Sequence, residues 1–420
     1  MKMKKTLLSI AASAALLGSA MPALAVGPAG GAQCVVEERE GRAASERVGR
    51  SIQRAFDLFD EEKIDEAIAI LVDMSPRSDY DKAYVNRFIA NLAAGQEGRQ
   101  ELAMERIALA LDANILSNQD HGQLLRLQGD LAVQNEQYPE AMAAFQNWMD
   151  FTCDENDMVY LRMAVASSEL KQFDDVIAYA DAAMRVKGEP DRNIYLLKMG
   201  AYYEQKKFEL AAGELEALLT HFPDNPKLWV QLGQLYLLAE NNEKALYTMD
   251  IAFRNDLLDT GAELRLLGQL LLQRELPYAS AIIQEFALER ELIDREANVL
   301  SAIGSSFYQA RETDKAIEYF GQAAEISNLS KDHRRKANLL VQQERYGEAK
   351  VALNKALKGD ELENEGQIFL QLAQAHFYLD EFKEAKAAAE KAMREERLKR
   401  SVEGWLAYIE DVAKRRGIEM

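Results

Sequence analysis

The sequence predicts an all-α solenoid of about ten helix-turn-helix units, followed at the C-terminal end by one capping helix. Helix-favouring residues such as Ala, Leu, Glu, Gln and Lys are abundant, whereas proline occurs only 8 times in 420 residues. No run rich in Val, Ile and Thr between Gly and Pro indicates a β-sheet. Small residues also recur at a nearly constant interval along most of the chain, which is typical of stacked helical units.

The first 25 residues have the pattern of a secretory signal peptide. Three lysines occur among the first five residues, an apolar run extends from Leu7 to Leu17, and Ala23-Leu24-Ala25 forms an A-x-A cleavage site. We therefore predict export and cleavage after Ala25. The apolar run is too short to span a bilayer, and no later segment reaches about 18 continuous apolar residues, so no integral membrane segment is expected after cleavage.

Residues 26–47 are predicted to form an extended N-terminal lead. The stretch begins with several Gly and Pro residues and shows no apolar periodicity. It contains Cys34, and the other cysteine of the chain is Cys153. An oxidising compartment would allow a Cys34–Cys153 disulfide, and the alternative is two free thiols. Neither cysteine belongs to a C-x-x-C pair, so a redox enzyme is not expected.

Helical units are predicted from residue 48 to residue 400. One small or apolar residue marks the second helix of each unit, at intervals of 33 to 38 residues. The ten markers are Ala67, Ala103, Ala141, Val176, Ala211, Ala245, Ala281, Ala316, Ala349 and Ala385. Residues 401–420 are predicted to form a capping helix and tail, because their apolar residues fall on one stripe and cations follow in the last turn.

The stretch near the middle of the chain explains the spacing. Trp229, Leu232 and Tyr236 fall on one face of a predicted helix, and Gly233 allows a second helix to approach closely. Ala245 follows on the inner side of that second helix, where only a small side chain fits. This pattern resembles the tetratricopeptide repeat of roughly 34 residues. The resemblance implies a right-handed superhelical solenoid with a concave groove, lined by the first helix of each unit.

Patterns typical of catalysis and metal binding are missing from the sequence. The four histidines are scattered, and none lies at metal-ligand spacing from another His, Cys or Glu. There is no phosphate-binding G-x-x-x-x-G-K-[ST] loop and no G-x-S-x-G nucleophile motif. We therefore expect no enzyme activity, no cofactor and no metal. The aromatic residues at repeat spacing are expected to lie in the core.

The chain is strongly acidic, with a formal charge of −19, and loss of the three signal lysines leaves about −22. Such a charge repels nucleic acid and anionic lipid. It favours a protein partner with a basic surface, and the alternative is that it serves solubility alone.

One basic cluster stands out within the predicted array. By resemblance to the tetratricopeptide family, the second, fifth, sixth and ninth residues of a unit project into the groove. In the ninth unit these are Lys331, Arg334, Arg335 and Asn338, and Gln374 holds the ninth position of the tenth unit. The set resembles, in part, the carboxylate-clamp repeats that hold C-terminal peptides, with Gln374 as an approximate substitute for a further Asn or Lys. The alternative is a solvated helix start without a ligand.

A closer resemblance rests on the segments 81–88, 148–152, 222–229 and 404–409, together with the signal-like start. These segments are similar to those of exported repeat proteins that occur in Gram-negative bacteria alongside TonB–ExbB–ExbD-type energy-transducing systems. The resemblance implies a periplasmic scaffold, with TonB- or ExbD-type inner-membrane components as partners, in nutrient or iron uptake. The alternative is an assembly or chaperone-like factor for outer-membrane or cell-wall components.

Overall fold

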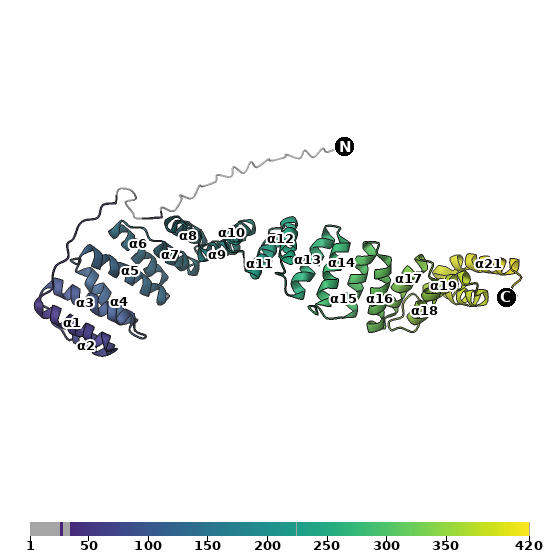
Figure 1. Ribbon diagram of the computed structural model, residues 1–420, viewed down its shortest axis with the longest axis horizontal. Helices are drawn as coiled ribbons and strands as arrows, with labels where there is room; N and C mark the ends of the chain where they lie inside the picture. The colour runs from purple at the N-terminus through teal and green to yellow at the C-terminus, as the bar shows by residue number, and fades with distance from the viewer. Residues whose placement is uncertain (1–25, 28–33, 224, 420) are drawn as a thin grey trace, which may run out of the picture. The chain divides into compact units, whose positions relative to one another are not determined.

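The computed structural model describes residues 26–27, 34–223 and 225–419, and the predicted signal peptide of residues 1–25 lies outside them. Within these described residues the secondary structure is helical and contains no β-strand (Figure 1). The helices of residues 46–222 are α1 (Glu46–Asp60), α2 (Ile64–Val72), α3 (Asp79–Ala94), α4 (Gln100–Asp112), α5 (Asn118–Gln134), α6 (Tyr138–Thr152), α7 (Asp157–Glu169), α8 (Phe173–Lys187), α9 (Arg192–Glu204) and α10 (Phe208–His221).

The remaining helices are α11 (Pro226–Leu238), α12 (Asn242–Arg254), α13 (Gly261–Gln273), α14 (Pro277–Glu289), α15 (Ala297–Gln309), α16 (Thr313–Ser327), α17 (Ser330–Gln342), α18 (Tyr346–Ala356), α19 (Glu365–Tyr378), α20 (Phe382–Ala392), the 3-10 helix η2 (Glu396–Leu398) and α21 (Lys399–Arg415).

The chain divides into two compact parts, Met1–Phe222 and Pro223–Met420, which we call the N-terminal half and the C-terminal half. In each half, consecutive helices pair, so that α1 to α10 form five pairs and α11 to α20 form five more. The prediction of an all-α array of ten helix pairs with a terminal helix is confirmed. The first helix begins at Glu46 and the last at Lys399, each two residues before the predicted boundary.

The marker residues of the second helices are the sites of closest helix packing. All ten are completely buried, and nine of them occupy the fourth position of their helix, while Ala281 occupies the fifth position of α14. A small side chain at this position lets the partner helix approach. The same packing needs a glycine on the facing helix at Gly129, where an added Cβ would lie 2.5 Å from the ring of Phe145. The constant spacing of small residues is therefore a record of one repeated contact.

The terminal helix α21 covers the last pair, as predicted. Its residues Val402, Ile409 and Ala413 are fully buried. Trp405 lies 5.8 Å from Phe377 of α19, ring centroid to ring centroid, in an edge-on arrangement. The helix therefore gives the last pair an apolar neighbour, as the next unit does for the other pairs of the C-terminal half.

The described part of the N-terminal lead runs as an extended segment along the N-terminal half. Cys34 and Cys153, at the end of α6, are joined by a disulfide. The Asn118 side chain holds the backbone beyond it, since its Oδ1 accepts from the Arg39 N–H at 3.0 Å and its Nδ2 donates to the Glu37 carbonyl at 2.9 Å. The lead thus runs from the third helix pair back toward the first and continues directly into α1. We call this tethered segment the strap.

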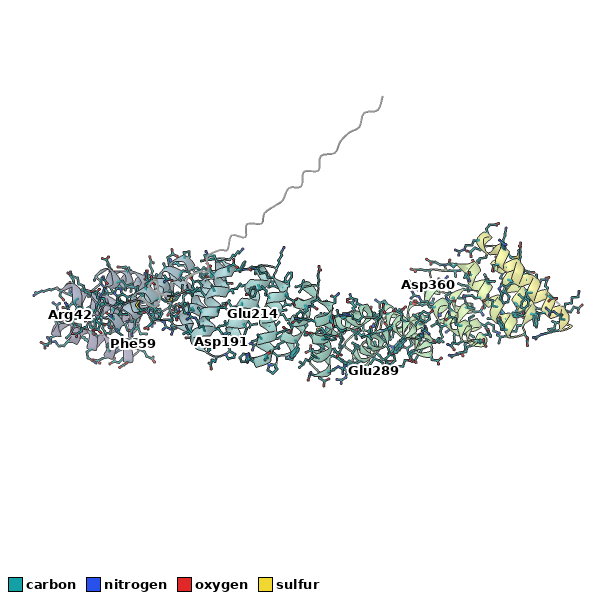
Figure 2. All side chains as sticks on the ribbon, turned by 90° about the horizontal axis from the view of Figure 1, so that it is seen from above. Arg42, Phe59, Asp191, Glu214, Glu289 and Asp360 are labelled. Atoms are coloured by element: carbon teal, nitrogen blue, oxygen red, sulfur yellow. A yellow bond between two sulfur atoms is a disulfide. The ribbon has the colours of Figure 1, made fainter. Side chains whose placement is uncertain are left out.

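Further contacts fix both ends of this strap. Near its start, Gln146 Nε2 donates to the Gly27 carbonyl at 3.0 Å. Near its end, the backbone N–H of Arg42, labelled in Figure 2, donates to the Tyr80 hydroxyl at 3.2 Å, and the Ser45 N–H donates to Asp81 Oδ1 at 2.9 Å. Most of these contacts reach the backbone of the lead, so they depend little on its side chains.

Acidification should weaken the N-terminal half through His121. This histidine is 7% exposed, and its ring centroid lies 4.4 Å from that of Phe151, with the two rings tilted. Burial lowers the pKa of His121, and the charge of Arg39 lowers it further. The folded protein therefore binds this proton less readily than the unfolded chain, whose histidine titrates near pH ~6.5. The stabilisation is complete above that pH and is lost as the pH falls below it.

We therefore expect the melting temperature of the N-terminal half to fall between about pH 7.5 and about pH 5.5, and to fall less in His121→Gln. His333 is a suitable internal reference, because burial lowers its pKa too and it is present in both proteins. Calorimetry at the two pH values measures the difference. An identical pH dependence in the parent and in His121→Gln would contradict this account.

Candidate partner-binding face

The candidate site is a face formed by the first helices of the last four pairs, α13, α15, α17 and α19. Side chains of α13 and α15 line one cavity together. The Arg335 guanidinium of α17 donates a hydrogen bond of 2.7 Å to Ser301 Oγ of α15. The Gln371 amide of α19 donates one of 2.6 Å to Asn338 Oδ1 of α17. These contacts place the four helices side by side, and we call their shared surface the inner face.

The inner face combines basic and neutral polar side chains. They lie on the same sides of α13, α15, α17 and α19 as the residues that make these contacts. Its members are Arg265, Gln269, Asn298, Ser301, Ser305, Gln309, Lys331, Arg334, Arg335, Asn338, Gln371 and Gln374.

Acidic side chains are absent from this set, although the whole chain has a charge of −19. Helix α15 contains no acidic residue. In α13, Glu263 is used in the capping box with Thr260. In α17, Asp332 is 3% exposed and accepts from Ser327 Oγ at 2.8 Å. In α19, Glu365 lies in the first turn and lines a separate cavity at the C-terminal end of the array. The set of inner-face residues therefore has four cations and no carboxylate, which favours an acidic ligand.

The start of α17 is fixed by the neighbouring loops. The Ser330 N–H donates to the carbonyl of Asp360, labelled in Figure 2, at 2.8 Å, and the Asp360 N–H donates to the Asn328 carbonyl at 2.8 Å. Buried Asp332 lies one turn away, 3.5 Å from Arg335. These contacts hold the first turn of α17, so the basic cluster projects from a rigid element.

The predicted binding residues differ in whether their side chains already contact other residues of the protein. Lys331 is exposed and Arg334 half-buried, and neither has an ion-pair partner among the residues that the structure describes. Arg335 is engaged by Ser301 and Asp332, and its guanidinium lies 5.9 Å from the Phe320 ring centroid. Lys331 and Arg334 are therefore the cations available to a partner.

The predicted amide residues Asn338 and Gln374 also differ in their hydrogen bonds. Asn338 accepts its hydrogen bond from Gln371, whereas Gln374 makes none with another described residue. The Gln371 Oε1 atom is buried without a partner. Asn338 and Gln371 thus form a fixed amide pair between α17 and α19, and Gln374 remains available one turn farther along α19.

Lys336 follows these cations directly in the sequence and adds a fourth cation to the basic cluster, but it lies on the opposite side of α17. It lines a cavity of about 220 Å³ with Glu325, Glu348 and Lys355. His333 lies in the same cavity and is 5% exposed. The basic cluster of the sequence is therefore divided between two surfaces, and Lys336 does not belong to the inner face.

One cavity on the inner face was not predicted from the sequence. It has a volume of about 440 Å³ and opens between α13 and α15, with apolar walls that include Leu272, Ile293 and Val299. At its floor, the Gln284 amide donates to Ser280 Oγ at 3.0 Å and to Ser306 Oγ at 3.4 Å. The sequence signal that could have revealed it is the small or neutral character of groove positions in the seventh and eighth units.

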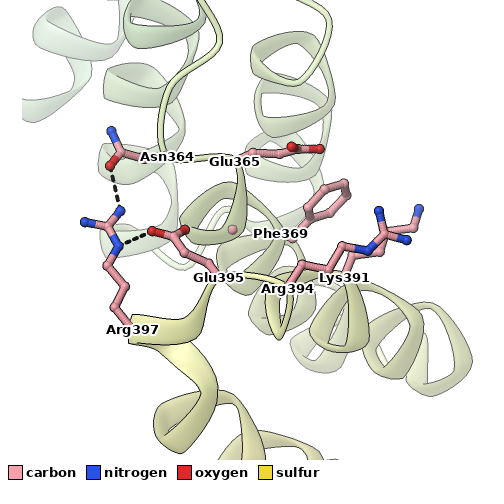
Figure 3. Close-up of a pocket in the computed structure, with 8 residues that line it drawn as sticks. Asn364, Glu365, Phe369, Lys391, Arg394, Glu395 and Arg397 are labelled. Carbon is pink, nitrogen blue, oxygen red and sulfur yellow. Dashed lines mark hydrogen bonds and ion pairs between the residues drawn. The ribbon is translucent and has the colours of Figure 1, made fainter.

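A second cavity lies at the C-terminal end of the array, between α19, α20 and η2 (Figure 3). Its volume is about 320 Å³. On one side Arg397 binds Glu395 and donates at 2.8 Å to Asn364 Oδ1. On the other, the Lys391 amine lies 5.1 Å from the Phe369 ring centroid. Positive and negative side chains alternate around this cavity, so its charge does not distinguish one class of ligand.

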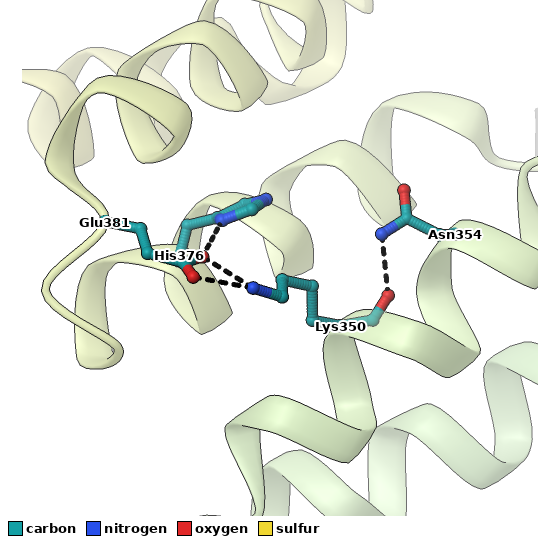
Figure 4. A network of polar contacts seen from close by, with 4 residues as sticks. All are labelled: Lys350, Asn354, His376 and Glu381. Atoms are coloured by element: carbon teal, nitrogen blue, oxygen red, sulfur yellow. Dashed lines mark hydrogen bonds and ion pairs between the residues drawn. The ribbon is translucent and has the colours of Figure 1, made fainter.

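A polar network joins the ninth and tenth pairs (Figure 4). Lys350 of α18 donates to both carboxylate oxygens of Glu381, at 2.7 and 2.8 Å. His376 Nδ1 lies 2.5 Å from Glu381 Oε2. Hydrogen bonds from Lys350 and His376 lower the pKa of Glu381. Because each polar group meets a protein partner, this network holds the two pairs together.

The expectation that the aromatic residues lie in the core is wrong for several of them. Tyr278, Tyr308 and Tyr378 are 51%, 47% and 53% exposed. They lie near the turns within helix pairs and outside the inner face. Trp229 of the consensus stretch is only half-buried, and its indole N–H donates to the Pro223 carbonyl at 3.1 Å.

No helix in the described ranges has both the length and the apolar character needed to cross a membrane. The same residues contain no cluster of three or more His, Cys, Asp or Glu side chains that could hold a metal ion.

Comparisons with known proteins agree with the paired helices. Models of the tetratricopeptide repeat match residues 201–256 and residues 366–397. The protein CTR9 homolog of Arabidopsis thaliana is 31% identical over 134 residues, which are 29% of this chain and 12% of that protein. This chain thus matches only about an eighth of that relative's length.

Two solved structures are similar at low identity. The TPR2AB-domain:pHSP90 complex of yeast Sti1 has a TM-score of 0.31 and 15% identity, over 60% of this chain and 98% of that one. A tetratricopeptide repeat protein from Parabacteroides merdae has a TM-score of 0.32 and 14% identity, over the same shares of the two chains. From the matches to the repeat models and the paired helices, we conclude that the chain carries tetratricopeptide repeats, which indicate a scaffold for protein–protein interaction.

Proposed function

We propose that this protein is a non-enzymatic scaffold that binds an extended acidic segment of a partner protein on the inner face of its C-terminal half. The observation that carries the proposal is the charge of this face, which has Arg265, Lys331 and Arg334 and no acidic residue in a chain of charge −19. Charge-assisted hydrogen bonds to carboxylates would supply affinity, and the neutral amides would bind peptide groups.

We further propose that the scaffold acts in the periplasm as an accessory of a TonB–ExbB–ExbD-type system in nutrient or iron uptake. The signal-like N-terminus and the Cys34–Cys153 disulfide support export, because disulfides persist in oxidising compartments. The similarity of several segments to exported repeat proteins supports the link to TonB- and ExbD-type components. The second candidate is an assembly or chaperone-like factor for outer-membrane or cell-wall components, which the same export pattern and acid-free face also suit.

In-cell crosslinking from a photoreactive residue at position 331, followed by mass spectrometry, separates the two candidates. Inner-membrane transport components among the products would support the accessory role. Outer-membrane precursors would support the assembly factor instead. A photoreactive residue at position 355, on the opposite cavity, serves as the control for products that do not come from the inner face.

Charge reversal should abolish most of the binding to an acidic segment. The double variant Lys331→Glu, Arg334→Glu replaces the two cations of α17 on the inner face that have no ion-pair partner among the described residues. We expect it to weaken binding of an acidic peptide by about tenfold or more, since hydrogen bonds to charged groups are the strong ones. Fluorescence anisotropy measures the affinity, which should also fall with salt.

The matched control is Lys355→Glu, Lys358→Glu, which changes the net charge equally. Both residues lie at the end of the ninth pair, away from the inner face. An equal loss of affinity in the two double variants would show that net charge alone attracts the peptide, and would refute the inner face as its site.

A further inference from the structure

We infer that the acidic segment also carries a large apolar side chain, and that this side chain enters the cavity between α13 and α15. It lies about three to five residues from the acidic residues of the segment. This inference rests on the proposed function, because it concerns the same face. The cavity volume of about 440 Å³ falls within the range of about 300–1,000 Å³ typical of ligand pockets.

The cavity has the composition of an anchor site for an apolar side chain. Leu272, Ile293, Val299 and the exposed Ala302 give it apolar walls. The polar groups at its floor are already satisfied, since the Gln284 amide binds the hydroxyls of Ser280 and Ser306. An entering apolar group therefore displaces water without leaving a buried polar group unpaired.

The rim of the cavity differs from its walls. Gln269 and Gln309 lie there and make no side-chain hydrogen bond with another described residue. Each carboxamide offers both a donor and an acceptor, so it can bind the peptide groups of an extended chain. The Asn118 side chain binds the lead in this way in the N-terminal half, with one bond to an N–H and one to a carbonyl.

The distance between the cavity and the free cations sets the spacing in the ligand. The cavity opens on one side of α15, and α17 contacts the other side through Arg335 and Ser301. Neighbouring helices lie on the order of 10 Å apart, so Lys331 and Arg334 lie about 10–15 Å from the cavity. An extended chain rises about 3.3 Å per residue, which gives a separation of about three to five residues.

Charge complementarity selects the acidic partner segment over other occupants. The apolar run of this chain at residues 7–17 follows three lysines, which the cations of the inner face would repel. The apolar walls alone would accept many segments, whereas apolar walls near the cations of the inner face favour an apolar residue close to carboxylates. A second copy of the chain is distinguished in the experiment below.

The test uses the full chain and two fluorescent peptides. Each carries three acidic residues and, about four residues away, either Phe or Ala. Peptides with the acidic residues on either side of the anchor cover both directions of binding. In the better direction, the Phe peptide should bind the parent protein about ten- to a hundredfold more tightly than the Ala peptide, which is the effect of burying one aromatic side chain.

The variant Ala302→Trp should fill the cavity. The Phe and Ala peptides should then bind it with equal affinity, close to that of the Ala peptide for the parent protein. Ala302 is exposed, so a larger residue there does not disturb the core. The control is Val351→Trp, at a residue of α18 that is 57% exposed and lines the opposite cavity, where the preference for Phe should persist.

The outcomes separate this inference from the proposed function. Equal affinity of the parent protein for both peptides, with binding still dependent on the acidic residues, would refute the anchor and leave the acidic-segment site standing. No dependence on the acidic residues would refute the proposed function itself. Self-association of the parent in sedimentation experiments, lost in Ala302→Trp, would make a second copy of the chain the occupant and overturn the inference.

Discussion

Replacing Phe145 by alanine is expected to destabilise the N-terminal half by about 3–5 kcal/mol, as for other buried aromatic residues. Phe145 is completely buried in the core cluster around α6, α7 and α8. Its ring fills the space above Gly129, which has no side chain that could close a cavity. The loss should therefore lie toward the upper part of that range, and calorimetry of the full chain measures it.

The control is Phe59→Ala in the same half. Phe59, labelled in Figure 2, is 42% exposed, so its removal should cost much less. The transition of the C-terminal half should be unchanged in both variants, because each unit of a repeat array contacts mainly its neighbours. Similar losses of stability for Phe145→Ala and Phe59→Ala would contradict the packing described for Gly129.

Removal of the disulfide is expected to have an effect of similar size. The Cys34–Cys153 bridge closes a loop with a sequence separation of 119 residues. In the chain-entropy model, a disulfide that closes a loop of that length restricts the unfolded chain, and this restriction stabilises the folded state by about 4–5 kcal/mol. The double variant Cys34→Ser, Cys153→Ser should therefore melt earlier in its N-terminal half, and hydrogen exchange at the Arg39 amide should become faster.

Reduction of the parent protein provides the matched comparison. It breaks the same bond without a change in sequence, so the reduced parent and the double variant should melt alike. A double variant that keeps the stability of the oxidised parent would show that the hydrogen bonds of the lead, including those of Asn118, hold the strap without the bridge.

The fold could be predicted because one contact repeats ten times. Each marker from Ala67 to Ala385 lies where two helices approach closely, and every one of these positions requires a small side chain. The terminal helix was predictable for a related reason, since its apolar stripe at Val402 and Ile409 needs a surface to cover.

The candidate site could be predicted only in part. The sequence places Lys331, Arg334 and Arg335 on one stretch of helix. It does not reveal that Arg335 forms a hydrogen bond with Ser301 and an ion pair with Asp332. The cavity between α13 and α15 depends on the separation of two helices and on the size of side chains from both. Spacing along a single helix carries no information about such a gap.

The exposure of Trp229 has the same origin. Its position in the motif is correct, yet burial of a large ring depends on what lies beyond the edge of the helix pair, and here the ring is only half covered. The disulfide was open to both alternatives, because the distance between Cys34 and Cys153 depends on the path of a lead that has no periodic pattern.

The strap formed by the lead also determines how the array can begin to unfold. A stack of units usually frays from its ends, since an end unit has a neighbour on one side only. At the C-terminal end, α21 supplies the missing neighbour through apolar packing. At the N-terminal end, the lead ties the first pair to the third through a covalent bond, so these pairs are expected to open together. Fraying would then be a local event at one end of the chain and a cooperative event at the other.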